Sequence, residues 1–365
     1  MIAASARSQR PAGAKLLVLS ASGALVHVAR DALPQFAQRG DVVVANDAAT
    51  LPASLMGVHQ ASGAAIEVRL AGWLPDRVGD LAQCLAVVFG SGDYRTRTED
   101  RALPPALSPG DRLQLGPLRA TVVELRAPPR LVVLTLEGER DALWAALAQH
   151  GRPVQYAHVR EPLALWDVWT PIAGPPIAFE PPSAGFAIDW RTVAALRRRG
   201  VAWATLTHAA GLSATGDADL DARLPLPEPY VIAARTVRAI SRARATGGRV
   251  IAIGTTVVRA LEHAAASGAL RAGRGVADQK IGAATTLRIV DALLTGTHEA
   301  GGSHYELLRA FADEERLRAM SEALEAHDYR THEFGDSVLI ERPRASRGAM
   351  RVPVRREATQ QEYSR

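Results

Sequence analysis

Apolar residues along the chain follow the pattern of strands that alternate with helices. The continuous apolar run 41–47 ends in turn-forming residues, which is typical of a strand buried on both faces. The later part of the chain repeats the alternation, with a strand, a helix, a strand and a helix over 201–206, 233–245, 249–254 and 255–266. This order favours parallel pairing, so we predict an α/β body with a mixed sheet.

Residues 57–155 have a different pattern of short, alternating apolar and polar runs separated by Gly, Pro and Asp. Alternation with period two and frequent turn signals is typical of a small antiparallel barrel or sandwich. We therefore predict that an all-β barrel, 57–155, is inserted into an α/β main domain formed by 1–56 and 156–341. The remaining segment, 342–365, is rich in arginine and poor in apolar residues, so we expect it to be disordered.

Composition narrows the class of protein. The chain is 47% hydrophobic and 22% charged, as in ordinary globular proteins, and no apolar run reaches the ~18 residues of a membrane span. A single cysteine, Cys84, excludes an internal disulfide and a site with several thiolates, so we expect a cytoplasmic protein. The net charge of +5 comes almost wholly from arginine, which raises the probability of a nucleic-acid partner. The sequence leaves the oligomeric state open.

Two segments place polar groups where ligands bind in α/β proteins. Asn46 and Asp47 end a predicted strand, and carboxyl ends of strands form the binding edge of open α/β sheets. Thr255 and Thr256 open a predicted helix directly after a strand, where free backbone amides favour a phosphate, carboxylate or ribose hydroxyl. Arg259 lies three residues before Glu262 on the same helix, so an ion pair between them is the alternative to a functional role.

Common catalytic motifs are absent from the sequence. It contains no complete Gly-x-Gly-x-x-Gly, no P-loop and no Gly-x-Ser-x-Gly. An ordinary methyltransferase would need a glycine-rich loop after the first strand, and residues 20–24 are a poor version of one. None of the histidines 298, 304, 327 and 332 forms a helical His-x-x-x-His pair, so we predict no metal site.

Five segments, in order, resemble one enzyme family. The segment 247–262, which reads GGRVIAIGTTVVRALE, is similar to the signature of the S-adenosylmethionine:tRNA ribosyltransferase-isomerases. Four more stretches resemble the same family, namely GDVVVAND at 40–47, PSAG at 182–185, VDALLT with His298 at 290–298, and YR with FGDSVLI at 329–340. The resemblance spans nearly the whole chain and implies an α/β body with an inserted barrel.

The family resemblance implies a reaction in which S-adenosylmethionine donates its ribosyl group and no metal takes part. A base removes a proton beside the sulfonium, and the ylide attacks 7-aminomethyl-7-deazaguanine in the tRNA anticodon loop. Loss of adenine and methionine then leaves epoxyqueuosine. The implied catalytic residues are His208, Glu228, Asp291 and His298. The implied substrate-binding residues are Asn46, Asp47, Ser183, Gly185, Thr255, Thr256, Arg259 and Asp336.

The sequence departs from the family pattern at polar positions. Ala187 stands where the family has a histidine, and His208 is displaced by one residue from its expected place. Both histidines of a further family motif are missing from 224–230. The alternative is therefore a divergent paralogue that binds a nucleoside or RNA without catalysing the reaction.

Overall fold

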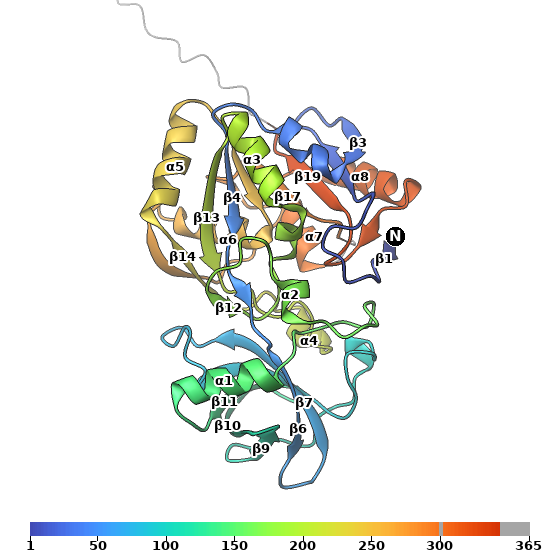
Figure 1. Cartoon of the computed structure of the whole chain (residues 1–365), viewed down its shortest axis with the longest axis vertical. Coiled ribbons are helices and arrows are strands. Elements are labelled where there is room, and N and C mark those ends of the chain that lie inside the picture. The colour runs from blue at the N-terminus through green and yellow to red at the C-terminus, as the bar shows by residue number, and fades with distance from the viewer. Residues whose placement is uncertain (299–301, 344–365) are drawn as a thin grey trace, which may run out of the picture.

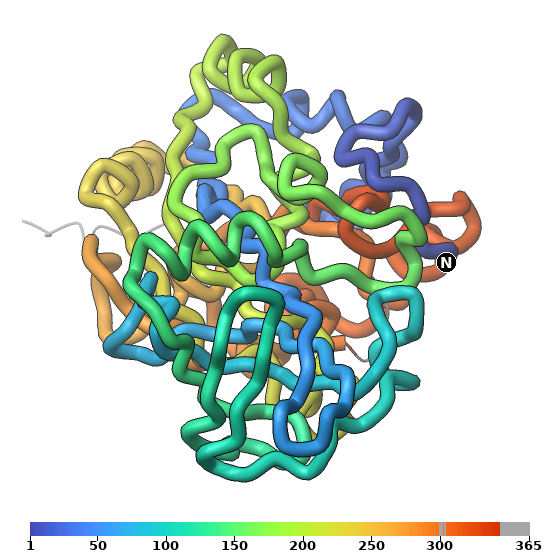
Figure 2. The backbone as a smooth tube through the Cα atoms, turned by 60° about the horizontal axis from the view of Figure 1, so that its bottom comes forward, coloured from blue at the N-terminus to red at the C-terminus, as the bar shows by residue number. Residues whose placement is uncertain are grey.

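The structure is a computed structural model, and it describes residues 1–298 and 302–343. The predicted tail lies outside the described residues from 344 onwards. A large α/β body forms one end of the molecule and a barrel the other (Figure 1). Figure 2 shows the N-terminus beside C-terminal segments of the body, and there β1 (Ile2–Ala3) pairs with β18 (Arg330–Thr331).

The body is built on a mixed nine-stranded sheet, which confirms the predicted α/β class. In spatial order the strands are β16 (Gly273–Ala277), β14 (Glu228–Ile232), β13 (Ala202–His208), β4 (Val42–Asn46), β15 (Val250–Ile253), β17 (Ala292–Gly296), β19 (Ser337–Glu341), β2 (Lys15–Leu19) and β3 (Leu25–Ala29). The four central strands β13, β4, β15 and β17 are parallel. Their carboxyl ends therefore meet at one edge of the sheet.

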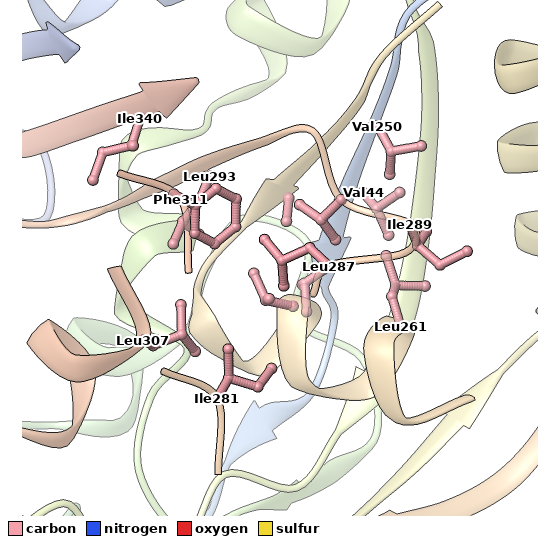
Figure 3. Close-up of a cluster of buried hydrophobic side chains, with 14 of the residues drawn as sticks. Val44, Val250, Leu261, Ile281, Leu287, Ile289, Leu293, Leu307, Phe311 and Ile340 are labelled. Atoms are coloured by element: carbon pink, nitrogen blue, oxygen red, sulfur yellow. The ribbon is translucent and has the colours of Figure 1, made fainter. Parts of the chain in front are cut away.

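Alternate residues of the central strands bury opposite faces of the sheet. Val42 and Val44 of β4 belong to the larger core, whereas Val43 and Ala45 belong to the core on the other face. The larger core packs against α5 (Ala234–Ala245), α6 (Thr255–Ala264), α7 (Ser303–Leu308) and α8 (Glu314–Ala326). Figure 3 shows part of this core, where Leu261 of α6 lies near Val44 and Val250 of the sheet.

The opposite face is covered by α3 (Trp190–Arg198) and η1 (Arg30–Phe36). Asp189 begins α3 by accepting a hydrogen bond from the Thr192 amide at 2.7 Å. The η1 segment is a 3₁₀ helix with Pro34 inside it. Proline lacks the N–H that an α-helix interior requires, which accounts for the tighter 3₁₀ turn of this segment.

The barrel has six antiparallel strands and is closed, which confirms the predicted barrel architecture. Its strands are β6 (Ser54–His59), β7 (Ala65–Trp73), β8 (Gln83–Phe89), β9 (Arg112–Leu115), β10 (Leu118–Ala127) and β11 (Leu131–Leu136). A helix that the strand pattern does not predict, α1 (Arg140–His150), follows β11. Leu143 and Leu147, one helical turn apart, join the barrel core from this helix.

The chain returns from the barrel to the body through a segment with little regular structure. The short elements of this return segment are α2 (Leu165–Val168) and β12 (Pro176–Ala178). Three more short elements complete the fold, namely η2 (Thr98–Asp100), η3 (Ser183–Ala187) and α4 (Ala218–Asp221). On its return β12 pairs with β5 (Ala49–Thr50), which directly precedes the barrel. No helix in the described part of the chain is both long and apolar enough to span a membrane.

Candidate active site

A cavity of about 290 Å³ lies at the edge of the sheet where the four parallel strands end. This edge is the usual ligand site of open α/β sheets. The lining comes from the body and from the segments around η3 and α4, and none of the barrel strands contributes to it. Six residues predicted from the sequence line the cavity, namely Ser183, Glu228, Thr255, Thr256, Arg259 and His298.

Helix α6 begins at the wall of the cavity. Its N-cap residue, Gly254, has φ +93°, a left-handed conformation that favours glycine, and an added Cβ would lie 3.4 Å from the Ala184 Cβ. The turn brings the hydroxyls of Thr255 and Thr256 to the cavity together with the first turn of the helix. Because the first amides of a helix have no intrahelical acceptor, this wall suits an anionic or hydroxyl group.

Glu228 and Arg259 form a buried ion pair beside the cavity. Glu228 Oε1 accepts a hydrogen bond from the Gly211 amide at 2.6 Å, and Arg259 Nη2 donates to the Ala277 carbonyl at 2.7 Å. Burial lowers the pKa of Arg259 to about 10, so the guanidinium stays charged at neutral pH. Glu262 does not pair with Arg259; its carboxylate accepts hydrogen bonds from the amides of residues 288–290.

His208 lies behind this pair and not in the cavity lining. It ends β13, is fully buried, and places Nε2 3.5 Å from Glu228 Oε2. Burial, with a smaller contribution from Arg259, holds the pKa of His208 well below its usual value. Its imidazole is therefore neutral at pH 7 and supports the Glu228 side of the cavity from behind.

Asn46 and Asp47 form hydrogen bonds between the ends of β4 and β13, beneath the cavity. Asn46 Nδ2 donates to the His208 carbonyl and Asn46 Oδ1 accepts from the His208 amide, both at 2.9 Å. Asp47 Oδ1 accepts a hydrogen bond from the Thr207 hydroxyl at 2.6 Å. These contacts tie the ends of β4 and β13 together, and neither side chain lines the cavity.

The other three predicted residues also lie outside the cavity lining. Gly185 lies in η3, two residues after Ser183, and an added Cβ would be 2.9 Å from the Thr170 Cγ2. Asp291 precedes β17 at the opposite edge of the sheet, where it accepts a hydrogen bond from the Val250 amide at 2.9 Å. Asp336 accepts hydrogen bonds from the backbone amides of Lys15 and Arg330 at 2.6 and 2.8 Å.

Glu180 also lines the cavity, although no sequence motif indicates it. Its Oε1 accepts hydrogen bonds from the Tyr156 hydroxyl and, at 3.0 Å, from the Ser213 amide. Burial raises the pKa of Glu180 to about 7, despite the hydrogen bonds that favour its ionised form. A carboxyl group with this pKa can both accept and donate a proton near neutral pH.

A pair of histidines forms another part of the wall. The rings of His298 and His304 stack at 4.9 Å, and His304 is a second cavity residue that sequence motifs do not indicate. His298 Nε2 is 2.7 Å from the Thr295 hydroxyl. Burial lowers the pKa of both histidines, with the larger shift at His298, so their rings are uncharged at pH 7.

One group of side chains outside the cavity has metal-ligand chemistry. Ligand atoms of His158, His332 and Glu333 lie within 4.8 Å of one another, and His158 Nε2 is 2.6 Å from Glu333 Oε2. An ion pair between a histidine and a glutamate accounts for this contact. The absence of a metal from the reaction stays a prediction.

Comparisons with known proteins agree over nearly the entire chain. Residues 1–340 match the family described as queuosine biosynthesis protein. A relative from Thermosynechococcus vestitus, named S-adenosylmethionine:tRNA ribosyltransferase-isomerase, is 33% identical over 332 residues, covering 89% of this chain and 88% of its own. A relative of the same name from Sorangium cellulosum is 35% identical over 358 residues, covering 90% and 92%.

A solved structure of an S-adenosylmethionine tRNA ribosyltransferase from Thermotoga maritima also matches, with 21% identity and a TM-score of 0.47. The match covers 93% of this chain and 95% of that one. On the evidence of the family match and of relatives at least 30% identical over most of both chains, the protein belongs to the queuosine biosynthesis protein family.

Proposed function

We propose that this chain transfers and isomerises the ribosyl group of S-adenosylmethionine onto 7-aminomethyl-7-deazaguanine in the tRNA anticodon loop, giving epoxyqueuosine. The observation that carries the proposal is the cavity at the carboxyl edge of the sheet. The first turn of α6, the buried Glu228–Arg259 ion pair and Glu180 all lie at its wall. Both substrates are polar, charged molecules of the cytoplasm, which is where we place the reaction.

The two sides of the cavity suit the two ends of the sulfonium nucleoside. Thr255, Thr256 and the free amides of α6 offer donors for the methionine carboxylate or the ribose hydroxyls. The carboxylate of Glu228 is already neutralised by Arg259. Two more carboxylates line the cavity, but Asp221 accepts hydrogen bonds from Thr215 and Glu306 pairs with Arg309. Glu180, whose pKa lies near 7 and which has no cationic partner among the described residues, is the carboxyl group that we assign to the positive sulfur.

We assign the proton transfers to Glu180. Its ionised form removes a proton from the ribosyl carbon bonded to sulfur. The electron pair left on that carbon opens the ribose ring, and the glycosidic bond breaks so that adenine leaves after gaining a proton. The aminomethyl nitrogen of the deazaguanine base is the nucleophile: it forms the new carbon–nitrogen bond and loses a proton. An oxygen of the opened sugar then displaces methionine, which leaves with the sulfur electron pair, and closes the epoxide. Protonated Glu180 is matched in pKa to supply that proton. The uncharged ring of His298, held by Thr295, adds no positive charge of its own beside the sulfonium.

The test is to incubate the chain with S-adenosylmethionine and an anticodon stem–loop carrying 7-aminomethyl-7-deazaguanine. We expect free adenine and methionine in equal amounts, and none when guanine replaces the modified base. Formation of S-adenosylhomocysteine would show methyl transfer and refute the proposal. Binding of both substrates without release of adenine would favour a paralogue that has lost the reaction.

A further inference from the structure

Helix α5 displays a row of arginines on its outer face. Arg235, Arg238 and Arg242 are all exposed, and their spacing of three and four residues places them on one side of the helix. Thr236, Ile240 and Ala243 bury the opposite side. The row therefore faces away from the body.

These charges are not balanced by neighbouring carboxylates. Helix α5 contains no acidic residue, and within residues 1–298 and 302–343 none of the three arginines forms an ion pair. Helix α8 differs, because its Arg316 and Arg318 pair with Asp313 and Glu322. Unpaired guanidinium groups on a rigid helix are suited to phosphate oxygens, which they can contact in a bidentate manner.

The edge of the sheet connects this row with the cavity. The ladder between β14 and β16 begins at the cavity, where Glu228 pairs with Ala277, and ends where Ile232 pairs with Gly273. Helix α5 follows directly, on the same outer side of the body as β14 (Figure 1). Four residues of strand correspond to roughly 13 Å, so the helix begins a short distance from the cavity wall.

Two further exposed arginines lie along this ladder. Arg274 is in β16 and pairs in register with Val231, which is itself exposed. Arg271 precedes the strand by two residues and is exposed as well. β16 is the outermost of the described strands on this side of the sheet, so none of those strands covers its outer edge. Among the described residues neither of these arginines forms an ion pair.

We propose that α5 and β16 bind the phosphate backbone of the substrate RNA, through an arginine surface made of Arg235, Arg238, Arg242, Arg271 and Arg274. This inference rests on the proposed function and adds to it the place where the RNA binds. A base turned out of the anticodon loop enters the cavity, and the adjoining backbone lies along β16 towards α5. Backbone contacts of this kind position an RNA without reading its sequence, so the modified base alone selects the substrate.

The test compares the full chain with its R235Q/R238Q/R242Q variant. Glutamine has nearly the helix propensity of arginine, so α5 is preserved. Affinity for a fluorescent anticodon stem–loop is measured by anisotropy between 50 and 200 mM salt. We expect the slope of log affinity against log salt to become shallower by about 2–3, with affinity falling on the order of 10- to 100-fold at the lowest salt. Affinity for S-adenosylmethionine should be unchanged, which also reports an intact body.

The matched control is R191Q/R197Q/R198Q, which removes the same charge from exposed positions of α3, on the other face of the sheet. We expect this variant to retain most of the RNA affinity. Equal losses in the two variants would mean that only total charge matters, and would overturn the proposal, as would unchanged affinity in the α5 variant. RNA binding that depends on α5 without any release of adenine would refute the proposed function and leave this surface standing.

Discussion

The hydroxyl of Tyr156 donates a hydrogen bond to the carboxylate of Glu180 at the wall of the cavity. Burial, together with the neighbouring carboxylate, raises the pKa of Tyr156 well above its usual value, so the phenol keeps its proton across the working pH range. Tyr156 belongs to the segment through which the chain returns from the barrel. The proposed acid–base group of the body is thus oriented by a residue from outside the sheet.

Replacing Glu180 with glutamine should abolish most of the turnover. The amide keeps the shape and the hydrogen bond to Tyr156 but cannot take a proton, so we expect kcat to fall by about 10²- to 10⁴-fold. The KM for S-adenosylmethionine should change much less. Single-turnover release of adenine from the modified stem–loop measures both. Retention of more than half of the wild-type kcat would remove Glu180 from the chemistry.

Replacing Tyr156 with phenylalanine should shift the pH dependence of kcat without abolishing the reaction. In the wild-type protein this hydrogen bond stabilises ionised Glu180, so its removal raises the pKa of Glu180 above the wild-type value of about 7. We expect the ascending limb of the kcat profile to shift to higher pH, as measured between pH 5.5 and 9. Y94F is the matched control, because Tyr94 contacts the Arg160 carbonyl at an exposed position. A profile that does not move in Y156F would contradict this coupling.

Glu180 should also make the folded protein less stable as pH rises. Its folded-state pKa of about 7 is above the ordinary value of 4.5, so the stabilisation is complete below pH 4.5 and is lost as pH rises through 7. The E180Q variant lacks this titration. Its free energy of unfolding relative to wild type should therefore increase between pH 5 and pH 8, measured by urea denaturation. A constant difference over this interval would show that the carboxyl group is not perturbed.

Breaking the Glu228–Arg259 pair should destabilise the fold strongly. R259A leaves a buried carboxylate without its partner, which typically costs about 3–5 kcal/mol in the free energy of unfolding. The double variant E228Q/R259M removes both charges and should cost less than R259A. Urea denaturation measures all three proteins, with R318A, from an exposed pair on α8, as a control expected to match wild type. A double variant as unstable as R259A would show that the shape of the pair, and not its charge, is required.

Thr255 should contribute to donor binding through its hydroxyl. T255V keeps the size of the side chain and removes the donor, so we expect the Kd for S-adenosylmethionine to rise about tenfold, by isothermal titration calorimetry. T255S retains the hydroxyl and should bind like wild type. Equal affinity in T255V and wild type would exclude a contact from this hydroxyl.

Much of the sheet could be predicted because its central strands are apolar on both faces. The runs around Val43 and Ile251 are too short for helices and too apolar for surface strands. The strands β14 and β16 could not be predicted in this way. Pro229 interrupts the apolar pattern of β14, and Gly273 and Gly275 interrupt that of β16. β14 pairs with β13 on one side and with β16 on the other, so their pairing depends on the rest of the sheet. The division of the chain at 57 and 155 stays a prediction.

Periodicity alone could predict the cavity only where a strand leads directly into a helix, as at Thr255 and Thr256. Ser183 and His298 lie in segments that resemble the family, whereas Glu228 lies in 224–230, which departs from the family motif. Glu180 lies in a stretch without a periodic signal and His304 lies in the short helix α7, and no motif marks either residue, so only the folded chain brings them to the cavity. The roles of Asp291 and Asp336 stay predictions, and in the structure both carboxylates are engaged by backbone amides.

The last strand in the described part of the chain, β19, lies inside the sheet, between β17 and β2. The hairpin formed by β2 and β3 is the first part of this sheet to be synthesised, and among the described strands β19 is its one neighbour in the sheet. While the ribosome is still producing residues 337–341, this hairpin has no place to dock and exposes the backbone edge of Leu16 to Leu19. Completion of the body must therefore wait until translation of β19 is over, and a prematurely terminated product would leave the hairpin detached and open to chaperones.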